Sequence, residues 1–550
     1  MLERAGCAAA ALVAALFFLR AQPSSPRTGA QILSFLSSVD DSEQPYALYV
    51  PPGFDPARKY PLVVSLHSED STQRLNMRQL FGITQRYGEA DPPDMRYFPV
   101  AHPVDFLVAC PSARGSMGYQ GVAEQDVYDT LADVERRFPV DEDRVYLTGI
   151  SMGGGGALWL ALTRPDVWAA TAPLCPLAPP GTWERAENAS NLAVRLFQGE
   201  LDPVAAPATT RAWQRRFLDA GVPAGYLEYP GVRHNVWDFA YRNNALFDWF
   251  APLHRNPFPE RVRFVTHSYR YSRAYWLAID GLTPGAPASI DAVWTSRTAL
   301  KVDTAGIDGF TVTMSKPATA PISVLIDGTA LRVRPAARLS FTRASGQWRA
   351  GRFAPTGKRP GLEGPIWQAV ASRHIYVYGT RGDPTAEELE RRRQIAETAA
   401  EWSTPRNRLA LKLPVKADTA ITPADLESAD LVLFGTTATN SIIVRFADRL
   451  PLSLNPGAAD YGLLFIAPIG KHYALVNSGL PWWTGADEAR PTIGSSFSPP
   501  QFRLLENFGD YILFKGSLAG VVAEGRFDRN WKLPTDEAAK VAAAGTVAIQ

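Results

Sequence analysis

Short apolar runs alternate with helical patterns from residue 31 to residue 258, and this alternation limits the possible folds more than any other feature of the chain. The runs include YALYV, PLVVSLH, DFLVACP, RVYLTGI and AVRLFQG. Between two of them, Val127, Leu131, Val134 and Phe138 recur at helical spacing. Strands that alternate with helices predict a mostly parallel sheet covered on both faces. We therefore expect an α/β domain over residues 28–258.

The character of the sequence changes twice after this region. Residues 259–352 contain alternating β-branched pieces separated by turn residues, which predicts a small antiparallel β domain. From 353 to 525 strand-like and helical segments alternate again, which predicts a second open α/β sandwich of unknown role and without a cofactor. Residues 526–550 are expected to be a C-terminal tail. Several domains are also expected because 550 residues exceed what one hydrophobic core usually holds.

The first 22 residues have the pattern of a signal peptide. Arg4 precedes an apolar run of 12 residues, Ala8–Leu19, which is short of the roughly 20 that span a bilayer. Cleavage near Ala21 would direct the protein to the periplasm or the outside of the cell, with no stable membrane insertion afterwards. A retained anchor or a wrongly chosen start codon is the alternative.

Charge and cysteine content restrict the possible partners. The formal net charge of +1, from 56 basic and 55 acidic residues, provides no long-range field for nucleic acid, so no nucleic-acid partner is expected. Signal cleavage would leave Cys110 and Cys175, which are expected to be buried free thiols, with a single disulfide as the alternative. The chain has no zinc-binding spacing, and no metal is expected.

The sequence Gly149-Ile150-Ser151-Met152-Gly153 follows a strand-like segment and precedes an apolar helical one. This G-x-S-x-G pattern is typical of a nucleophile elbow, in which small residues on either side of the serine let strand and helix approach closely. The turn presents the serine Oγ at the carboxyl edge of the sheet. Ser151 is therefore the predicted nucleophile.

A serine hydroxyl needs a base to accept its proton, and the base needs a carboxylate to orient it. His234 lies between a strand-like and a helical segment, 83 residues after Ser151, as the order serine, acid, histidine requires. Asp202, which follows the strand-like AVRLFQG, is the predicted acid, and Glu200 in the same loop is its rival. One oxyanion N–H is expected from Met152.

At these residues the chain resembles the α/β-hydrolase superfamily, in particular its prolyl-oligopeptidase-like and feruloyl-esterase-like branch of bacterial secreted esterases with extra C-terminal domains. The resemblance covers about residues 31–258 and rests on YALYVPPGFDPARKYPLVVSLH, GISMGGGGA, FQGELDPV and YPGVRHNVW. It implies a second oxyanion N–H after the run PLVVSLH, at Ser68 or Glu69. Ser68 stands where many such enzymes have glycine.

The resemblance and the candidate triad together predict a secreted serine carboxylic-ester hydrolase that forms an acyl-enzyme and needs no cofactor. Its expected partner is a small-molecule or polysaccharide-linked ester, such as an acetyl or hydroxycinnamoyl (feruloyl) ester of a plant polysaccharide. A serine peptidase of the prolyl-oligopeptidase type is one alternative, because the same triad cleaves amides. A non-catalytic binding module on a hydrolase scaffold is another. The sequence leaves the acyl group, the alcohol and the oligomeric state open.

Overall fold

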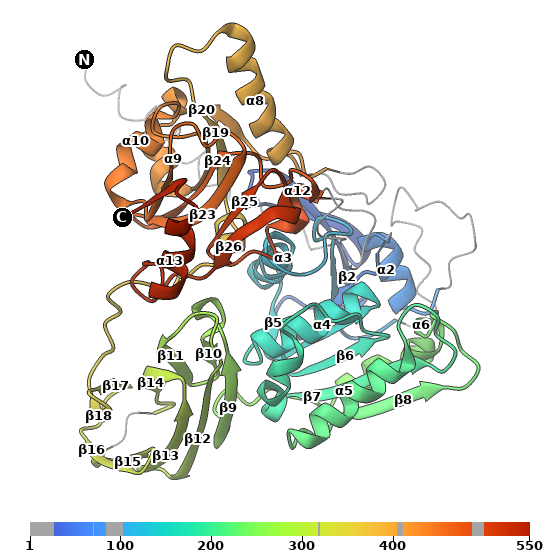
Figure 1. Cartoon of the computed structure of the whole chain (residues 1–550). Helices are drawn as coiled ribbons and strands as arrows, with labels where there is room; N and C mark the ends of the chain where they lie inside the picture. The colour runs from blue at the N-terminus through green and yellow to red at the C-terminus, as the bar shows by residue number, and fades with distance from the viewer. Residues whose placement is uncertain (1–26, 70, 84–102, 317–318, 404–410, 487–499) are drawn as a thin grey trace, which may run out of the picture.

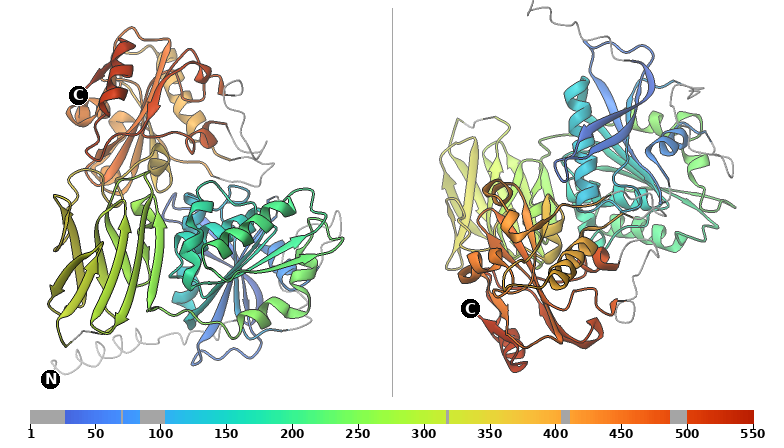
Figure 2. Two further views of the ribbon diagram at one scale, coloured as in Figure 1. Left: turned by 60° about the horizontal axis from the view of Figure 1, so that its bottom comes forward. Right: turned by 90° about the horizontal axis from the view of Figure 1, so that it is seen from above.

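The computed structural model describes residues 27–69, 71–83, 103–316, 319–403, 411–486 and 500–550. The expected signal peptide therefore lies outside the described residues. Three bodies are visible: an N-terminal α/β domain, a two-sheet β domain beside it, and a C-terminal α/β domain that lies against both (Figures 1 and 2). Within the described ranges, no helix combines the length and the apolar character needed to cross a membrane.

The N-terminal domain contains one eight-stranded sheet in the order β1-β2-β4-β3-β5-β6-β7-β8. The first two junctions, β1–β2 and β2–β4, are antiparallel and all later ones are parallel. The mostly parallel sheet predicted for this region is confirmed. Its strands are β1 (Gly29–Leu36), β2 (Glu43–Val50), β3 (Tyr60–Leu66), β4 (Leu107–Pro111), β5 (Val140–Ile150), β6 (Ala170–Leu174), β7 (Ala193–Gly199) and β8 (Gly225–Tyr229).

Helices cover both faces of this sheet, as the hydrophobic runs require. Strand β3 shows how: Leu62 packs in a core cluster with residues of α3, α4 and α5, whereas its neighbour Val63 packs in a second cluster with residues of α2 and α7. Successive strand residues point to opposite faces, so a run buried throughout needs a cover on each side. The helices are α2 (Gln73–Leu80), α3 (Val122–Arg137), α4 (Met152–Thr163), η3 (Trp183–Asn191), α5 (Pro207–Asp219), α6 (Trp237–Ala240), η4 (Arg242–Asn244) and α7 (Ala245–Phe250).

The middle domain is a sandwich of two five-stranded sheets, β10-β11-β14-β17-β18 and β16-β15-β13-β12-β9. All its pairings are antiparallel except β13–β15, which is parallel and departs from the all-antiparallel expectation. Aromatic and β-branched residues from both sheets form its core. Its elements are β9 (Arg261–Thr266), η5 (Tyr269–Tyr271), β10 (Arg273–Ala274), β11 (Leu277–Leu282), β12 (Ala288–Ser296), β13 (Ala299–Ala305), β14 (Ile307–Thr313), β15 (Ile322–Ile326), β16 (Thr329–Val333), β17 (Arg338–Ala344) and β18 (Gln347–Ala350).

The C-terminal domain contains a seven-stranded sheet in the order β20-β19-β21-β24-β23-β25-β26. The pairings from β20 to β24 are parallel and those from β24 to β26 are antiparallel. Its elements are η6 (Ile366–Val370), β19 (His374–Tyr378), α8 (Ala386–Ala400), β20 (Val415–Ala417), η8 (Asp418–Ala420), α9 (Pro423–Ser428), β21 (Asp430–Phe434), α10 (Ser441–Phe446), η9 (Ala447–Arg449), β22 (Leu452–Leu454), β23 (Tyr461–Ile469), β24 (His472–Gly479), α12 (Pro500–Leu504), β25 (Tyr511–Lys515), η10 (Leu518–Gly520), β26 (Val521–Gly525), α13 (Thr535–Ala543) and β27 (Val547–Ile549).

Residues 526–550, expected to be a tail, are part of this C-terminal domain. Strand β27 pairs with β22, and α13 packs on β26 and β27. Phe527 and Val541 are buried. The expectation was wrong because the partners of this segment lie far back in the chain, so no local pattern of the segment reveals its pairing.

The sandwich is fixed to the N-terminal domain by polar contacts as well as packing. The side-chain amide of Asn188 in η3 donates to the carbonyl of Val265 in β9 (2.9 Å), and its oxygen accepts the Val265 N–H (2.7 Å). The buried carboxyl of Glu124 in α3 accepts hydrogen bonds from Tyr271 Oη (2.7 Å) and Trp159 Nε1 (3.0 Å). The Tyr271 contact therefore places one hydroxyl of the middle domain inside the N-terminal domain.

The C-terminal domain contacts both other bodies. Arg373 forms an ion pair with Asp41 of the β1–β2 connection (2.6 Å). The buried carboxyl of Glu363 accepts the backbone N–H of Tyr269 (2.6 Å) in the first turn of the sandwich. The three bodies therefore share interfaces pairwise.

Candidate active site

Ser151 lies on the tight turn between β5 and α4. Its backbone has φ 57° and ψ −112°, a conformation that is strained for a residue with a side chain. The turn is fixed by the Ser151 N–H, which donates to the carbonyl of Leu174 (2.9 Å). A Cβ at Gly149 would collide with the carbonyl of Gly153, and a Cβ at Gly153 would collide with the carbonyl of Leu66. The sequence thus needs glycine at both positions for β5, α4 and β3 to meet.

His234 lies in the loop after β8 and faces the serine. Its Nε2 is 3.0 Å from Ser151 Oγ, within hydrogen-bond reach of a base for the hydroxyl proton. The edge of the imidazole packs at right angles to Trp237, with ring centroids 5.7 Å apart. The Cys175 thiol approaches the His234 carbonyl at 3.8 Å. The contact of Trp237 with the imidazole ring and the contact of Cys175 with the His234 backbone therefore help to fix the position of His234.

Asp202 lies in the loop after β7 and contacts the other nitrogen of the imidazole. Its Oδ2 and Oδ1 are 2.8 and 3.0 Å from His234 Nδ1. The carboxylate is itself fixed, because Oδ1 accepts the N–H groups of Val204 (2.8 Å) and Ala205 (2.9 Å), and Oδ2 accepts Gln198 Nε2 (3.1 Å). An acceptor held in this way keeps the proton of a neutral imidazole on Nδ1, which leaves Nε2 as the acceptor.

Glu200, the rival acid, is directed elsewhere. Its Oε2 accepts the backbone N–H of Gly231 (2.8 Å), and the residue is exposed to solvent. Asp202 is only 6% exposed. The structure thus brings Ser151, His234 and Asp202 together and gives Glu200 a contact between the two loops.

The two predicted oxyanion donors lie on either side of this junction. Met152 is the first residue of α4, where backbone N–H groups have no partner within the helix. Ser68 lies just past the end of β3, whose last carbonyl approaches Gly153. The hydrogen bonds among the described residues include none donated by the N–H of Met152 or Ser68. Both groups are therefore available to a developing negative charge.

A buried histidine, His67, fixes the loop that contains Ser68, and the sequence reasoning gave it no role. Its Nδ1 lies 2.8 Å from the Ser68 carbonyl and its Nε2 lies 2.9 Å from the Ser112 carbonyl. The Tyr119 hydroxyl donates to the His67 carbonyl (2.9 Å). The position of a histidine directly after a buried strand, in LHS, was the available signal.

Three potential metal ligands meet at the same place: atoms of Cys175, Asp202 and His234 lie within 4.8 Å of one another. Burial raises the pKa of the Cys175 thiol strongly, which disfavours the thiolate that a metal needs. The Asp202 carboxylate and the His234 imidazole already form a hydrogen bond with each other. The described residues are thus better explained as a serine–histidine–aspartate relay beside a buried thiol. Cys110 and Cys175 are both free and buried, as expected.

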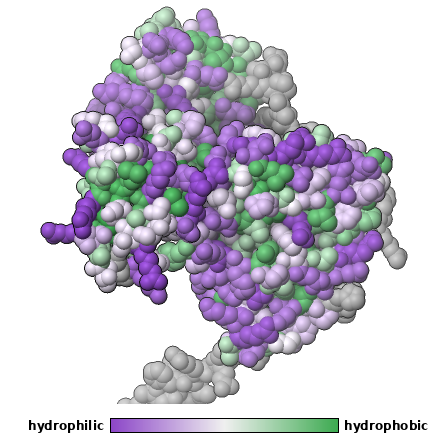
Figure 3. Space-filling view, turned by 90° about the horizontal axis from the view of Figure 1, so that it is seen from below, coloured by the Kyte–Doolittle hydropathy of each residue, from purple (hydrophilic) through white to green (hydrophobic). Residues whose placement is uncertain are grey.

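Apolar side chains are exposed on the loops around the triad. Leu177, whose N–H donates to the Ser151 carbonyl (3.2 Å), is 43% exposed, and Leu201 and Val204 beside Asp202 are 58% and 57% exposed. Single exposed apolar side chains are common on protein surfaces, but these three lie on the loops that hold Ser151 and Asp202 and place apolar surface beside them. On the face seen in Figure 3, hydrophobic residues form small separate areas among hydrophilic ones.

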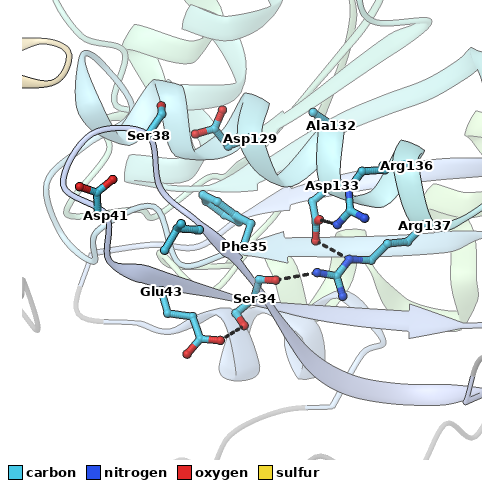
Figure 4. Close-up of a pocket in the computed structure, with 11 residues that line it drawn as sticks. Ser34, Phe35, Ser38, Asp41, Glu43, Asp129, Ala132, Asp133, Arg136 and Arg137 are labelled. Carbon is cyan, nitrogen blue, oxygen red and sulfur yellow. Dashed lines mark hydrogen bonds and ion pairs between the residues drawn. The ribbon is translucent and has the colours of Figure 1, made fainter. Parts of the chain in front are cut away.

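A cavity of about 660 Å³ lies elsewhere, between the β1–β2 hairpin and α3 (Figure 4). Several of its polar groups have partners within the lining: Asp133 pairs with Arg137 (2.9 Å), and Ser34 donates to Glu43 (2.6 Å). None of its lining residues belongs to the triad or its loops. The candidate site is therefore identified by the geometry of the three side chains and not by this cavity.

Comparison with known proteins finds similarity to esterases. Residues 37–241 match the model of the Esterase family, described as "Putative esterase". Cutinase 1 of Thermobifida cellulosilytica is 36% identical over 100 residues, which are 18% of this chain and 36% of that protein. A cutinase of Thermobifida fusca (strain YX) is 36% identical over 100 residues, 18% of this chain and 31% of that protein. The chain thus spans about a third of the length of these relatives.

Two solved structures each match about two fifths of the chain. One, titled "Crystal Structure of a Thermostable Esterase", has 24% identity and a TM-score of 0.33, and the match covers 41% of this chain and 63% of that one. The other, a ferulic acid esterase, has 18% identity and a TM-score of 0.32, with 40% of this chain and 99% of that one covered. The resemblance of the N-terminal domain to the α/β-hydrolase superfamily rests on its strand order, its elbow and the esterase match.

Proposed function

We propose that the protein is a serine hydrolase of carboxylic esters in which Ser151, His234 and Asp202 act as the catalytic triad. The observation that carries the proposal is the continuous relay from Asp202 Oδ2 to His234 Nδ1 (2.8 Å) and from His234 Nε2 to Ser151 Oγ (3.0 Å). The match of residues 37–241 to an esterase family and the cutinase relatives favour esters over amides.

The geometry supports an acyl-enzyme mechanism. His234 accepts the proton of Ser151 as Oγ attacks the ester carbonyl, and Asp202 stabilises the imidazolium that forms. The N–H groups of Met152 and Ser68 donate to the oxyanion. His234 then protonates the leaving alcohol and activates the water that releases the acid. No step requires a group other than these residues and water.

The finer substrate assignment is also a proposal. Exposed Leu177, Leu201 and Val204 around the triad favour an acyl or alcohol group with apolar surface, such as a hydroxycinnamoyl group attached to a polysaccharide. An acetyl ester has less apolar surface to cover these side chains. Export across a membrane, proposed from residues 1–22, would bring the enzyme to such polymers.

Two measurements on the full-length chain test the proposal. A fluorophosphonate probe should label the wild type and not Ser151→Ala, because only an activated serine attacks phosphorus. The purified enzyme should hydrolyse p-nitrophenyl acetate and methyl ferulate much faster than an aminoacyl p-nitroanilide. Faster cleavage of the anilide would indicate a peptidase, and absence of both labelling and turnover would indicate a non-catalytic scaffold.

A further inference from the structure

One stretch of the β-sandwich is rich in arginine and has no acidic residue in its own sequence. From Gly328 to Leu362 the chain has no aspartate or glutamate, although acidic and basic residues are almost equal in number over the whole sequence. Strands β16, β17 and β18 and their connections lie in this stretch. Between residues 332 and 352 it has six exposed arginines: Arg332, Arg334, Arg338, Arg343, Arg349 and Arg352.

These arginines differ from the two on β9 of the same sandwich in having no acidic partner. On β9, Arg261 pairs with Asp291 (2.8 Å) and Arg263 pairs with Glu187 (2.6 Å). In the part of the chain that the structure describes, none of the six arginines forms an ion pair with a carboxylate. Like charges that gather without counter-charges repel each other, so an anion bound between them would stabilise the arrangement.

Three of the six arginines line one groove. Arg334 follows β16, Arg338 begins β17 and Arg352 follows β18, and together they border a cavity of about 310 Å³. The walls between them are joined by the Gly351 N–H, which donates to the Ser340 carbonyl (2.9 Å). The groove is thus formed by the ends of three strands and not by one mobile loop.

We propose that this groove binds the carboxylate groups of an acidic, uronate-containing polysaccharide. The guanidinium group presents a planar pair of N–H donors that matches a carboxylate in bidentate fashion. The cavity volume lies at the lower end of the roughly 300–1,000 Å³ typical of small-ligand sites, which fits one or two sugar residues. Val333 and Ala350 add apolar surface among the arginines for the C–H face of a sugar ring.

The size and the charge of the site favour a glycan over a nucleic acid. A protein that binds duplex DNA typically neutralises about 6–10 phosphates along an extended positive surface. Here three arginines converge on one small groove in a chain of net charge +1. A uronate polymer offers one carboxylate on each uronate ring, beside uncharged hydroxyl groups, which suits contacts with single arginines.

Affinity electrophoresis of the full-length protein tests this site. The native protein is run through gels that contain polygalacturonate, neutral dextran or inorganic polyphosphate. The groove variant is R334A/R338A/R352A. The matched control is R297A/R445A/R449A, which removes the same charge from three exposed arginines outside the groove. Arg352→Gln alone is a second groove variant, since Arg352 lies outside any strand and its loss leaves the sheets intact.

Polygalacturonate should retard the wild type and the control variant to within about twofold of each other, and dextran should not. The groove triple variant should lose at least about tenfold in affinity, and R352Q a smaller part, with retardation of the wild type decreasing as salt rises. Equal retardation of wild type and groove variants would overturn the proposal, as would no retardation of the wild type. If polyphosphate retards the protein as strongly as polygalacturonate does, the groove binds anions in general, and the assignment to uronate is wrong.

The catalytic assignment and the groove can fail separately. Hydrolysis of p-nitrophenyl acetate should be the same in the groove variants as in the wild type, because none of the three arginines lies on a triad loop. Loss of polymer binding with full esterase activity supports the groove. Absence of esterase activity in the wild type, with polymer binding intact, would contradict the proposed function and leave the groove assignment standing.

Discussion

The carboxylate of Asp202 lies 2.8 Å from His234 Nδ1, while Glu200, two residues earlier in the same loop, accepts the N–H of Gly231. The difference arises from the turn after β7. The N–H groups of Val204 and Ala205 fix the Asp202 side chain so that it points inward, towards the imidazole. The same loop therefore contains one buried carboxylate facing the histidine and one exposed carboxylate facing the neighbouring loop.

Asp202→Asn should lower kcat by about 10⁴-fold, because an amide can donate to Nδ1 and thereby hold the imidazole in the wrong tautomer. Glu200→Gln is the matched control and should leave kcat within about threefold, since its contact with the Gly231 N–H needs only a carbonyl oxygen. Steady-state hydrolysis of p-nitrophenyl acetate measures both. A crippled Glu200→Gln beside an active Asp202→Asn would reverse the assignment of the acid.

Ser151→Ala and His234→Ala should each lower kcat by roughly 10⁴- to 10⁶-fold. The double variant should be about as slow as either single one, because the two residues act as a unit in one step. Circular dichroism checks that the fold is kept. Additive losses in the double variant would show that the two side chains act independently, contrary to the 3.0 Å contact between them.

The sequence predicted that Ser151, Asp202 and His234 lie together, because each position depends on local patterns and on chain order. Ser151 stands in a pentapeptide with a steric requirement, and Asp202 and His234 follow successive strands whose carboxyl ends meet at one edge of a parallel sheet. The packing around His67 was not predictable in this way. Its ring contacts Ser112, 45 residues away, and no periodicity reveals such a pair.

The arginine groove and the C-terminal segment were missed for a related reason. Arg334, Arg338 and Arg352 are ordinary surface residues in the sequence, and only the crossing between the two sheets brings them together. Strand β27 (Val547–Ile549) pairs with β22 (Leu452–Leu454), which lies far from it in the sequence. The parallel β13–β15 pair likewise depends on where β14 crosses to the other sheet. Contacts between distant segments decide these features, whereas local propensity decides the strands themselves.

A fragment of residues 28–258 should still bind a fluorophosphonate probe and hydrolyse p-nitrophenyl acetate, because it contains the complete eight-stranded sheet and the three residues of the proposed triad. It should also unfold at a lower temperature and aggregate. Removal of the sandwich uncovers Trp159, which is 6% exposed in the full chain. Light scattering and thermal denaturation measure both effects. A soluble, labelled fragment without turnover would show that the later domains complete the active site.

The stability of the C-terminal domain should fall as the pH falls from about 6.5 to 4. Burial lowers the pKa of His374 to about 4, since its ring is enclosed by Tyr376 and Trp402. In this window the unfolded chain binds a proton at this histidine and the folded chain does not, so the free energy of unfolding decreases by up to about 1.4 kcal/mol per pH unit. His374→Phe should flatten this dependence in urea titrations at pH 7, 6, 5 and 4.

His472 provides a control of opposite sign. A hydrogen bond with Asp430 raises its pKa, so its contribution to stability is fully present below the pKa of the unfolded chain and is lost as the pH rises through the folded pKa. His472→Gln should therefore destabilise the domain most at acid pH and steepen the acid loss. Identical pH profiles for the two variants and the wild type would show that carboxyl groups, and not these two histidines, govern the loss of stability in acid.

Tyr271→Phe should lower the free energy of unfolding by about 1–3 kcal/mol, because it removes the hydroxyl that donates to the buried Glu124 carboxyl at 2.7 Å and leaves part of that acceptor unsatisfied. Tyr275→Phe is the matched control. Its hydroxyl makes a longer contact of 3.3 Å with the Asn191 carbonyl, and its loss should cost less. Urea titration monitored by tryptophan fluorescence reports the contact directly, since Trp159 packs edge-on against the Tyr271 ring with centroids 5.4 Å apart. Equal effects of the two substitutions would mean that the Tyr271–Glu124 hydrogen bond contributes no more to stability than the longer Tyr275–Asn191 contact.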